Sequence, residues 1–483
     1  MQTASKKVIN GWAMYDWANS VYNLVITTTF FPIYFLSVTK GDDGTGMVTL
    51  FGRKFVNASL YDYTLAAAYL IIALLYPVLT SIADTRGNKK KFMRFFCYMG
   101  SLGCMSLFFF DSSNIWLGLL AFTLAAMGYV GSLVFYNAFL PEIAAPEDRD
   151  RISAKGFSYG YLGSVLMQMI GFGLVIFMKG KEGLASQITF LLVGIWWIGF
   201  AQITFRRVPE TPKPFAVKGN ALKDGFREVK KVYEEIKHLP VLKRFLRGFF
   251  FYSMGVQTVM LAATLFGSQL LHLADSKLIV TVVLIQLVAI AGAILMSRLS
   301  GKFGNISVLI GVVFFWILIC VAAYFIANVA EPLAPQHDAI EVLKKQYTAA
   351  VSAGDTGLAA QLTTAISAAE AKLAPAHTSV EFGFYGLAIA VGLVMGGIQS
   401  LSRSTYSKLM PETNDTASYF SYYDLTEKIA IVIGMFSFGY IGEITGNMKN
   451  SVLSLIFFFA VGIIWLFTAL RIRKTQPTGV AAS

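Results

Sequence analysis

The stretch GWAMYDWANSVYNLVITTTFFPIYF, residues 11–35, is almost entirely apolar, yet it carries Asp16, Asn19 and Asn23 in its first half. A helix of about 20 apolar residues crosses the ~30 Å hydrocarbon layer of a membrane and satisfies its own backbone polar groups there. The whole chain of 483 residues has the same character, with 55% hydrophobic residues, 14% charged residues and a mean hydropathy of +0.60. These values leave too little polar surface for a soluble globule. The sequence therefore predicts an all-α integral membrane protein.

Further apolar segments of this length follow the first one along the chain. The short alternating pattern of an outer-membrane barrel, with segments of about ten residues, is not found in the sequence. We therefore predict twelve transmembrane helices, at residues 12–37, 61–82, 92–110, 115–138, 155–178, 186–206, 246–271, 278–298, 306–328, 381–401, 417–440 and 451–471.

The distribution of positive charge predicts how the chain crosses the membrane. Most of the 40 lysine and arginine residues lie in alternate loops, beginning with the amino terminus, and basic loops favour the cytoplasmic side. We expect a multi-pass protein of the cell (inner) membrane with both termini in the cytoplasm. The net charge of +12 then faces anionic lipid, so it does not call for a nucleic-acid partner. Cys97, Cys104 and Cys320 all lie within predicted spans, which argues against a disulfide framework.

The longest basic connection divides the predicted spans into six and six. It runs from Arg207 to Phe245 and combines a proline-rich start with an amphipathic stretch. Weak internal similarity supports a duplication, because FYNAFLPE precedes the fifth span and STYSKLMPE precedes the eleventh. We predict an N-terminal six-helix bundle (1–206), a cytoplasmic linker (207–245) and a C-terminal six-helix bundle (246–483). The last includes an extracytoplasmic insertion (331–379), which reads as two helices broken between Ser352 and Thr356.

The loop after the second span, SIADTRGNKKKF, carries a charged motif at residues 81–92. It resembles the Gly-x-x-x-Asp-x-x-Gly-Arg/Lys-Arg/Lys motif of the major facilitator superfamily. Thr80 replaces the first glycine of that motif and Asn88 replaces its first basic residue. An acid and clustered cations near helix ends are able to latch the two halves together, although the same charges also serve as an orientation signal. The expected gating residues are Asp84, Arg86, Gly87, Lys89 and Lys90.

Three further stretches narrow the resemblance. WAMYDWANSVY (12–22), FYNAFLPEIAAPEDRDRISAKGFSYGYLG (135–163) and GGIQSLSRSTYSKLMPE (396–412) are similar to signature segments of one family. That family is typified by the fungal vacuolar amino-acid effluxer linked to autophagy, and it has many bacterial members without an assigned substrate. The resemblance implies the major facilitator fold of two pseudo-symmetric bundles, alternating access and a transport role, with an amino acid as the preferred substrate.

The polar residues of the opening stretch form one helical stripe. Asp16, Asn19, Asn23 and Thr27 are spaced i, i+3, i+7 and i+11. A charged group inside a membrane normally faces a cavity or an opposite charge rather than lipid. Asp16 is therefore either a proton or substrate site or one partner of a gate ion pair. The first helix of the second half carries Ser253 at the position that corresponds to Asp16, which predicts asymmetric coupling.

Other ionisable residues lie in the tenth and eleventh spans. Gln399 and Arg403 share a face, and the arginine suits a substrate carboxylate or a protein acid. Asp424 and Lys428 are spaced for an intrahelical pair, which would leave Glu427 as a proton carrier. Asn137 and Gln257 complete the predicted substrate or coupling-ion set.

A helix-packing face is predicted on the fifth span, where Gly156, Gly160 and Gly163 have small-residue spacing. The proline found on this helix in drug antiporters is missing.

Other functional classes find no support in the sequence. The sequence has no Gly-x-x-x-x-Gly-Lys-Ser/Thr phosphate loop. The four histidines, at positions 238, 272, 337 and 377, lack metal-ligand spacing, so we expect no metal, no cofactor and no enzyme activity.

We therefore predict a secondary transporter with a central cavity formed by helices one, four, five, seven, ten and eleven. The favoured function is proton-linked movement of a small polar solute, with amino-acid export preferred and a monomer as the expected state. Cation-coupled sugar transport is an alternative, in which Trp12, Trp17 and the tyrosines would stack on sugar rings. A scaffold or receptor that has lost transport and uses the insertion as its binding surface is another. A polar stripe inside the membrane favours transport over the scaffold.

Overall fold

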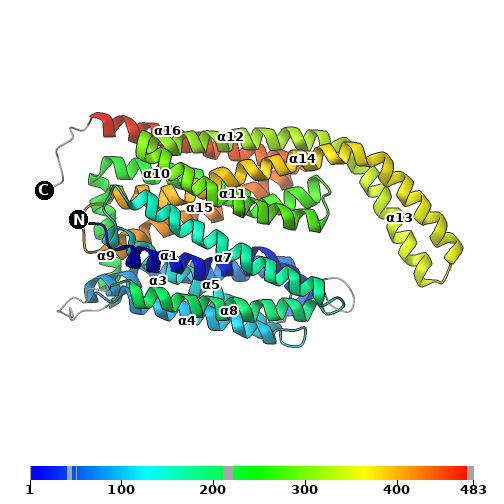
Figure 1. Ribbon diagram of the computed structural model, residues 1–483, viewed down its shortest axis with the longest axis horizontal. Helices are drawn as coiled ribbons and strands as arrows, with labels where there is room; N and C mark the ends of the chain where they lie inside the picture. The colour runs from blue at the N-terminus through cyan, green and yellow to red at the C-terminus, as the bar shows by residue number, and fades with distance from the viewer. Residues whose placement is uncertain (1, 41–45, 51, 210–220, 476–483) are drawn as a thin grey trace.

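The computed structural model describes residues 2–40, 46–50, 52–209 and 221–475. Within these residues, 12 helices are long and apolar enough to cross a membrane, which agrees with the predicted number. They run roughly along the long axis of the molecule and form two groups of six (Figure 1). The N-terminal half holds the first six spans and the C-terminal half holds the last six. The fold is therefore the predicted pair of six-helix bundles.

The helices of the N-terminal half run up and down the molecule in turn along the chain. They are α1 (Lys6–Val21), η1 (Tyr22–Phe30), α2 (Phe31–Val38), α3 (Asn57–Arg86), α4 (Lys89–Ser106), η2 (Leu107–Phe109), α5 (Ile115–Ala138), α6 (Leu140–Ile143), α7 (Arg149–Phe177) and α8 (Glu182–Arg207). A small antiparallel hairpin of β1 (Met47–Leu50) and β2 (Arg53–Val56) precedes α3.

The C-terminal half repeats this plan with one long extension. Its helices are α10 (Pro240–Leu265), η3 (Phe266–Leu270), α11 (Asp275–Phe303), α12 (Asn305–Ala330), η4 (Glu331–Leu333), α13 (Ala334–Ser352), α14 (Thr356–Leu409), α15 (Thr416–Thr445) and α16 (Met448–Thr475).

The first helix of each half changes from α-helix to π-helix, at η1 and at η3. In η1 the backbone carbonyl of Leu24 accepts hydrogen bonds from the Thr28 and Thr29 hydroxyls (2.9 and 2.8 Å) and from Gln168 Nε2 (2.9 Å). These side-chain donors engage a carbonyl that an ordinary helix would bond to its own backbone, which supports the wider turn. π-Helical turns are rare and frequently occur at functional sites.

The linker between the halves contains the predicted amphipathic helix, α9 (Ala221–His238). The proline-rich segment at 210–220 lies outside the described residues. α9 lies at the end of the molecule where α1 begins and α16 ends (Figure 1), which we call the terminal end. Lys231 Nζ donates to Asp415 Oδ2 (2.8 Å) and the Tyr419 hydroxyl donates to Glu235, so the linker helix is tied to the start of α15.

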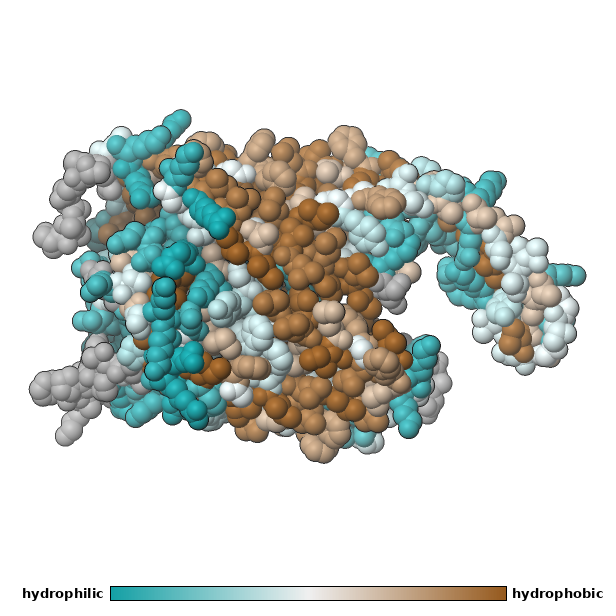
Figure 2. Space-filling model, in the orientation of Figure 1, coloured by the Kyte–Doolittle hydropathy of each residue, from teal (hydrophilic) through white to brown (hydrophobic). Residues whose placement is uncertain are grey.

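The predicted insertion is a helical hairpin at the opposite end, which we call the hairpin end (Figure 1). Its two helices are separated at the expected place, because α13 ends at Ser352 and α14 begins at Thr356. Asp355 caps α14 by accepting a hydrogen bond from the Leu358 backbone N–H (2.9 Å). The second helix of the hairpin is not a separate element, since α14 runs on through the tenth span without interruption. In the face seen in Figure 2, apolar side chains form a band between the terminal end and the hairpin.

Candidate functional site

A cavity of about 670 Å³ lies between the two halves. All six helices predicted to form it contribute side chains, namely α1 with η1, α5, α7, α10, α14 and α15. Two further helices, α3 and α11, also line it. The sequence analysis missed them because their contributions are mostly tyrosine and aliphatic residues, which do not stand out in an apolar span.

An ion pair closes the cavity toward the terminal end. Arg403 of α14 donates from Nη1 and Nη2 to Asp16 Oδ2 of α1, at 3.3 and 3.2 Å, and the Tyr136 hydroxyl donates to the same oxygen at 2.7 Å. Arg403 also donates to the Ser153 hydroxyl and carbonyl (both 2.9 Å) and to Asn137 Oδ1 (3.3 Å). Asp16 and Arg403 are 4% and 3% exposed. The pair joins the two halves, because its partners come from different bundles.

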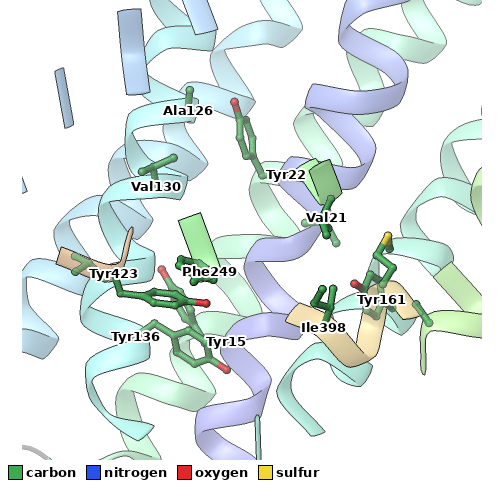
Figure 3. Close-up of a cluster of buried hydrophobic side chains, with 14 of the residues drawn as sticks. Tyr15, Val21, Tyr22, Ala126, Val130, Tyr136, Tyr161, Phe249, Ile398 and Tyr423 are labelled. Atoms are coloured by element: carbon green, nitrogen blue, oxygen red, sulfur yellow. The ribbon is translucent and has the colours of Figure 1, made fainter. Parts of the chain in front are cut away.

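Aromatic rings enclose this pair. The Arg403 guanidinium lies 4.9 Å from the Trp12 ring centre and 4.2 Å from that of Phe157. Tyr136 stacks on Trp12 at 4.5 Å, and Phe249 stacks on Tyr423 at 4.3 Å on the other side of the interface. Figure 3 draws Tyr136, Phe249 and Tyr423 in this layer. Such a low-dielectric surrounding strengthens the attraction between the two charges.

The three predicted packing glycines of α7 lie against α1. A Cβ atom at Gly156 would be 2.4 Å from Asp16 Oδ2 and 2.9 Å from Arg403 Nη2. At Gly160 it would meet the Ser20 hydroxyl at 2.5 Å, and at Gly163 the Trp17 carbonyl at 2.8 Å. Glycine at these positions allows α7 to approach the ion pair closely.

The acidic residues of α15 form a second charged group in the cavity wall. Lys428 Nζ lies 3.4 Å from Glu427 Oε2 and 5.4 Å from the ring centre of Tyr69, and Gln257 donates to Glu427 Oε1 at 3.0 Å. The predicted Asp424–Lys428 pair is therefore wrong. The longer Glu427 side chain reaches the lysine, whereas Asp424 is 5% exposed and its Oδ2 has no hydrogen-bond partner among the described residues. Asp424 is thus the acid left without a cation.

The remaining predicted residues lie in different surroundings. Asn23, Thr27, Asn137 and Gln399 line the cavity, and Tyr161 donates to Gln399 Oε1 at 2.5 Å. Asn19 does not line it. Its side chain is fully buried, with no hydrogen-bond partner among the described residues for either polar atom. The reason is rotation, because Asn19 lies about 60° around the helix from Asp16 and the cavity side turns toward Ser20 instead.

The two tryptophans of the sugar hypothesis lie outside the cavity. Trp12 is fully buried beneath Arg403, and Trp17 packs on Trp196 at 5.3 Å. Tyrosines, by contrast, do line the cavity, including Tyr69, Tyr76 and Tyr129.

The motif after α3 bridges the halves at the terminal end. Asp84 accepts hydrogen bonds from the backbone N–H groups of Ala417 and Ser418, at 3.2 and 2.7 Å, and from the Ser418 hydroxyl at 2.8 Å. These N–H groups belong to the first turn of α15, where a negative charge is favourable. Lys89 Nζ lies 3.1 Å from Asp84 Oδ1, pairs with Glu142 and donates to the Thr416 hydroxyl at 2.5 Å.

The other residues of the motif act within the N-terminal half. Gly87 adopts a left-handed conformation (φ 63°) that ends α3. Lys90 donates to the carbonyls of Phe205 and Val208 (3.3 and 2.7 Å) at the end of α8. Arg86 is exposed. Of the five predicted gating residues, Asp84 and Lys89 therefore bridge the two halves.

A second bridge between the halves was missed by the sequence analysis. Asp150 of α7 accepts hydrogen bonds from Ser300 Oγ (2.7 Å), Asn305 Nδ2 (2.6 Å) and Lys408 Nζ (2.6 Å) of the C-terminal half. Nearby, Arg149 Nη1 donates to the Ser407 carbonyl. A signal was available, since Asp150 and Lys408 lie in two of the stretches that carry the family resemblance.

The cavity is open toward the hairpin end. Its lining there includes Tyr63 and Phe436, which are 62% and 72% exposed, whereas Asp16 and Arg403 at its floor are buried. The bridges made by Asp84, Lys89 and Asp150 lie below that floor, whereas the bond from Tyr161 to Gln399 and one from Gln286 Nε2 to Gln168 Oε1 (2.9 Å) join the halves nearer the hairpin end.

These features define the class of the protein. Twelve membrane-spanning helices in two bundles, around a cavity closed at one end, form a membrane transporter of the major facilitator type. The chain belongs to the family described as "Vacuole effluxer Atg22 like", whose model matches residues 4–341 and 364–478. The unmatched residues, 342–363, form the outer part of the hairpin.

Individual relatives and solved structures agree with this assignment. The uncharacterized MFS-type transporter YxiO of Bacillus subtilis is 28% identical over 466 residues, covering 95% of this chain and 93% of its own. Autophagy-related protein 22 of Gibberella zeae is 23% identical, over 97% of this chain and 80% of its own. A bacterial homologue of the iron transporter ferroportin, in its outward-facing state, has a TM-score of 0.60 at 12% identity, covering 97% of this chain and 99% of its own. The E. coli fucose:proton symporter FucP has a TM-score of 0.58 at 11% identity, over 96% and 97% of the two chains. The structural likeness concerns the fold.

Proposed function

We propose that this protein is a secondary active transporter that moves a small zwitterionic solute by alternating access, coupled to protons, with amino-acid export as the preferred activity. The observation that carries the proposal is that buried and half-buried charges of both signs line one cavity. Arg403 and Lys428 are available to a carboxylate, while Asp16, Asp424 and Glu427 are available to an ammonium group. An amino acid carries both groups.

The charge pattern favours a zwitterion over a neutral sugar. Ionic groups are costly to bury, and a sugar needs only neutral hydrogen-bonding partners. The cavity tyrosines would serve either substrate, but the two tryptophans that favoured a sugar are outside the cavity. A scaffold without transport activity has no use for a charged cavity that is closed at one end only.

Proton coupling is proposed from Asp424. A carboxylate oxygen buried without a partner is far less costly when the group carries a proton. Asp424 shares the cavity wall with the Glu427–Lys428 pair. The arrival of a substrate ammonium group, or a rearrangement of the two halves, would therefore change the charges that surround Asp424. We propose that Asp424 exchanges a proton as the halves rearrange, and that Asp16 releases Arg403 in the same step.

We also propose that the terminal end faces the cytoplasm of a cell membrane, as the distribution of basic loops favours. Cysteines introduced at Thr356 in the hairpin and at Lys302 in the last turn of α11 would test this in intact cells. The first should react with an impermeant thiol reagent and the second should not. The reverse pattern would overturn the orientation.

Flux in proteoliposomes tests the function. Vesicles loaded with a mixture of radiolabelled L-amino acids should lose label faster with the parent protein than with empty vesicles, and an imposed pH gradient should change the rate. The double variant Asp16→Asn and Arg403→Gln serves as a folded-protein control. Release of labelled fucose or glucose, but of no amino acid, would support the sugar alternative. Release of neither, from protein that retains its fold, would support a scaffold.

A further inference from the structure

Three of the four histidines of the chain meet at the base of the helical hairpin. His272 follows η3, His337 lies in the first turn of α13 and His377 lies in α14. The ring centres of His272 and His337 are 4.8 Å apart with an interplanar angle of 16°, and those of His337 and His377 are 5.0 Å apart at 60°. Their spacing in the sequence gives no hint of this cluster.

The backbone conformation of His272, whose ring contacts the hairpin, is unusual. His272 has φ 51°, the only positive φ among the described non-glycine residues. This conformation is unfavourable for a residue with a side chain, and it persists where surrounding contacts hold it. The turn is held by hydrogen bonds from Leu271 N to the Phe266 carbonyl (3.2 Å) and from Leu273 N to the Gly267 carbonyl (3.0 Å). The contact between the rings is therefore a specific feature of this end of the molecule.

The geometry fits neutral rings rather than a bound metal ion. The ring nitrogens of two stacked imidazoles point along their own planes, so they do not converge on one point between the rings. Among the described residues, no group of histidine, cysteine and acidic side chains has the arrangement needed to hold a metal. Two stacked imidazoles that both carry a proton repel each other, because their charges lie within about 5 Å.

The charged groups around the cluster are mostly engaged with one another. Glu381 of α14 pairs with Lys277 of α11 and accepts a hydrogen bond from Tyr385 at 3.0 Å. Lys344 of α13 pairs with Glu370 of α14 at 3.1 Å. Asp338 follows His337 directly on α13 and is the acid that would favour a protonated ring there. Glu381 also attracts a protonated His377, but it is already paired with Lys277, so these two acids do not compensate three imidazolium groups and acidification weakens the cluster.

We propose that His272, His337 and His377 form a proton-sensitive contact that holds the hairpin against the turn after η3 while neutral and releases it when protonated. Burial of the ring, together with the neighbouring His272 and His377, lowers the pKa of His337 to about 4, so the contact is complete at neutral pH and is lost progressively as the pH falls toward that value. α14 carries His377 and the cavity residue Arg403 on one uninterrupted helix. The acidity of the compartment at the hairpin end is thereby sensed by a helix that lines the cavity.

Distances between spin labels in nanodiscs test this directly. Labels at Thr356, near the hairpin tip, and at Thr445, the last residue of α15, occupy exposed positions. The parent should give one narrow distance distribution at pH 8 and a broader or shifted one at pH 4, with a midpoint between about pH 4 and pH 6.5, because His337 is held below the ordinary histidine pKa. All samples contain EDTA, so that a bound metal ion does not contribute.

Substitutions at His337 test whether protonation of the histidine cluster causes the change in distance with pH. H337F keeps an aromatic ring in the stack but cannot take up a proton, so its distribution should stay narrow at both pH values. H337R carries a permanent charge and should give the acidic distribution already at pH 8. H238F, at the fourth histidine on α9, is the matched control and should behave as the parent. A parent distribution that does not change with pH, a pH response that survives in H337F, or a narrow H337R distribution at pH 8 would each overturn the proposal.

Discussion

Replacing Asp16 by asparagine removes one charge from the ion pair that joins the two halves. The three donors that reach Asp16 Oδ2 come from Tyr136 and Arg403, and only Arg403 belongs to the C-terminal half. The pair can therefore exist only while the terminal end is closed. The asparagine would keep the size of the side chain and one acceptor oxygen, but it would leave Arg403 as a buried charge without its counterion.

The structure sets the expected free-energy cost of the Asp16→Asn substitution. Breaking a buried ion pair by removing one partner costs about 3–5 kcal/mol. Arg403 retains its hydrogen bonds to Ser153 and Asn137 and its contacts with three rings, so we take the lower end of this range. Since every 1.4 kcal/mol is a factor of about ten, ~3 kcal/mol shifts the equilibrium between the closed and open terminal end by ~150-fold toward the open form.

Distances across the terminal end measure this shift. Spin labels at Lys91 of α4 and Lys302 of α11 are exposed and lie in opposite halves. The parent should give a short distance, and Asp16→Asn should add a longer one. Asp62→Asn is the matched control, because Asp62 is an exposed acid at the open rim of the same cavity. If Asp16→Asn gives the distribution of the parent, the ion pair does not hold the halves together and the reasoning fails.

Neighbouring contacts give three further predictions. Gly156→Ala should shift the same distance distribution and lower the melting temperature, because its Cβ would lie 2.4 Å from a buried carboxylate oxygen, whereas Gly173→Ala, with open space around it, should do neither. Asp150→Asn should lengthen the distance across the terminal end by weakening the bridge to α14, while Asp148→Asn, a half-buried acid paired with Arg151 in its own half, should leave it unchanged. Asp424→Asn should abolish accumulation driven by a pH gradient yet retain exchange of labelled for unlabelled solute; a variant that still accumulates solute as the parent does would exclude Asp424 as the coupling acid.

Much of the fold was predictable because the membrane imposes a strong constraint on sequence. Long apolar segments, the linker between the halves and the helix break near Ser352 all leave a local signal. The continuity of α14 through Pro375 was not predictable in this way, because a proline usually ends or kinks a helix and here it does not end it. The π-helical turn at η1 depends on Gln168 of α7, a residue far away in the sequence, so no local pattern in the first span indicates it.

The site was only partly predictable, since helical spacing tells which residues share a face but not what that face meets. The stripe from Asp16 to Thr27 was read as one surface, yet its Asn19 lies inside the N-terminal bundle. In α15, spacing favoured Lys428 with Asp424, but side-chain length and the position of Gln257 on the adjacent helix α10 favour Glu427. Both errors arose because the choice among neighbours on a helix is made by partners on other helices.

The stretches that carry the family resemblance meet at one place in the structure. Asp16 lies in the first, Ser153 in the second and Arg403 in the third, and these residues are joined by hydrogen bonds at the closed end of the cavity. Gln257 and Glu427, which line the cavity wall, lie outside all three stretches. The family resemblance therefore covers the contacts that close the terminal end and part of the cavity lining, but not the whole cavity wall. A resemblance located in this way supports a shared transport cycle more strongly than a shared substrate, which is why the identity of the solute has to be decided by flux measurements on this chain.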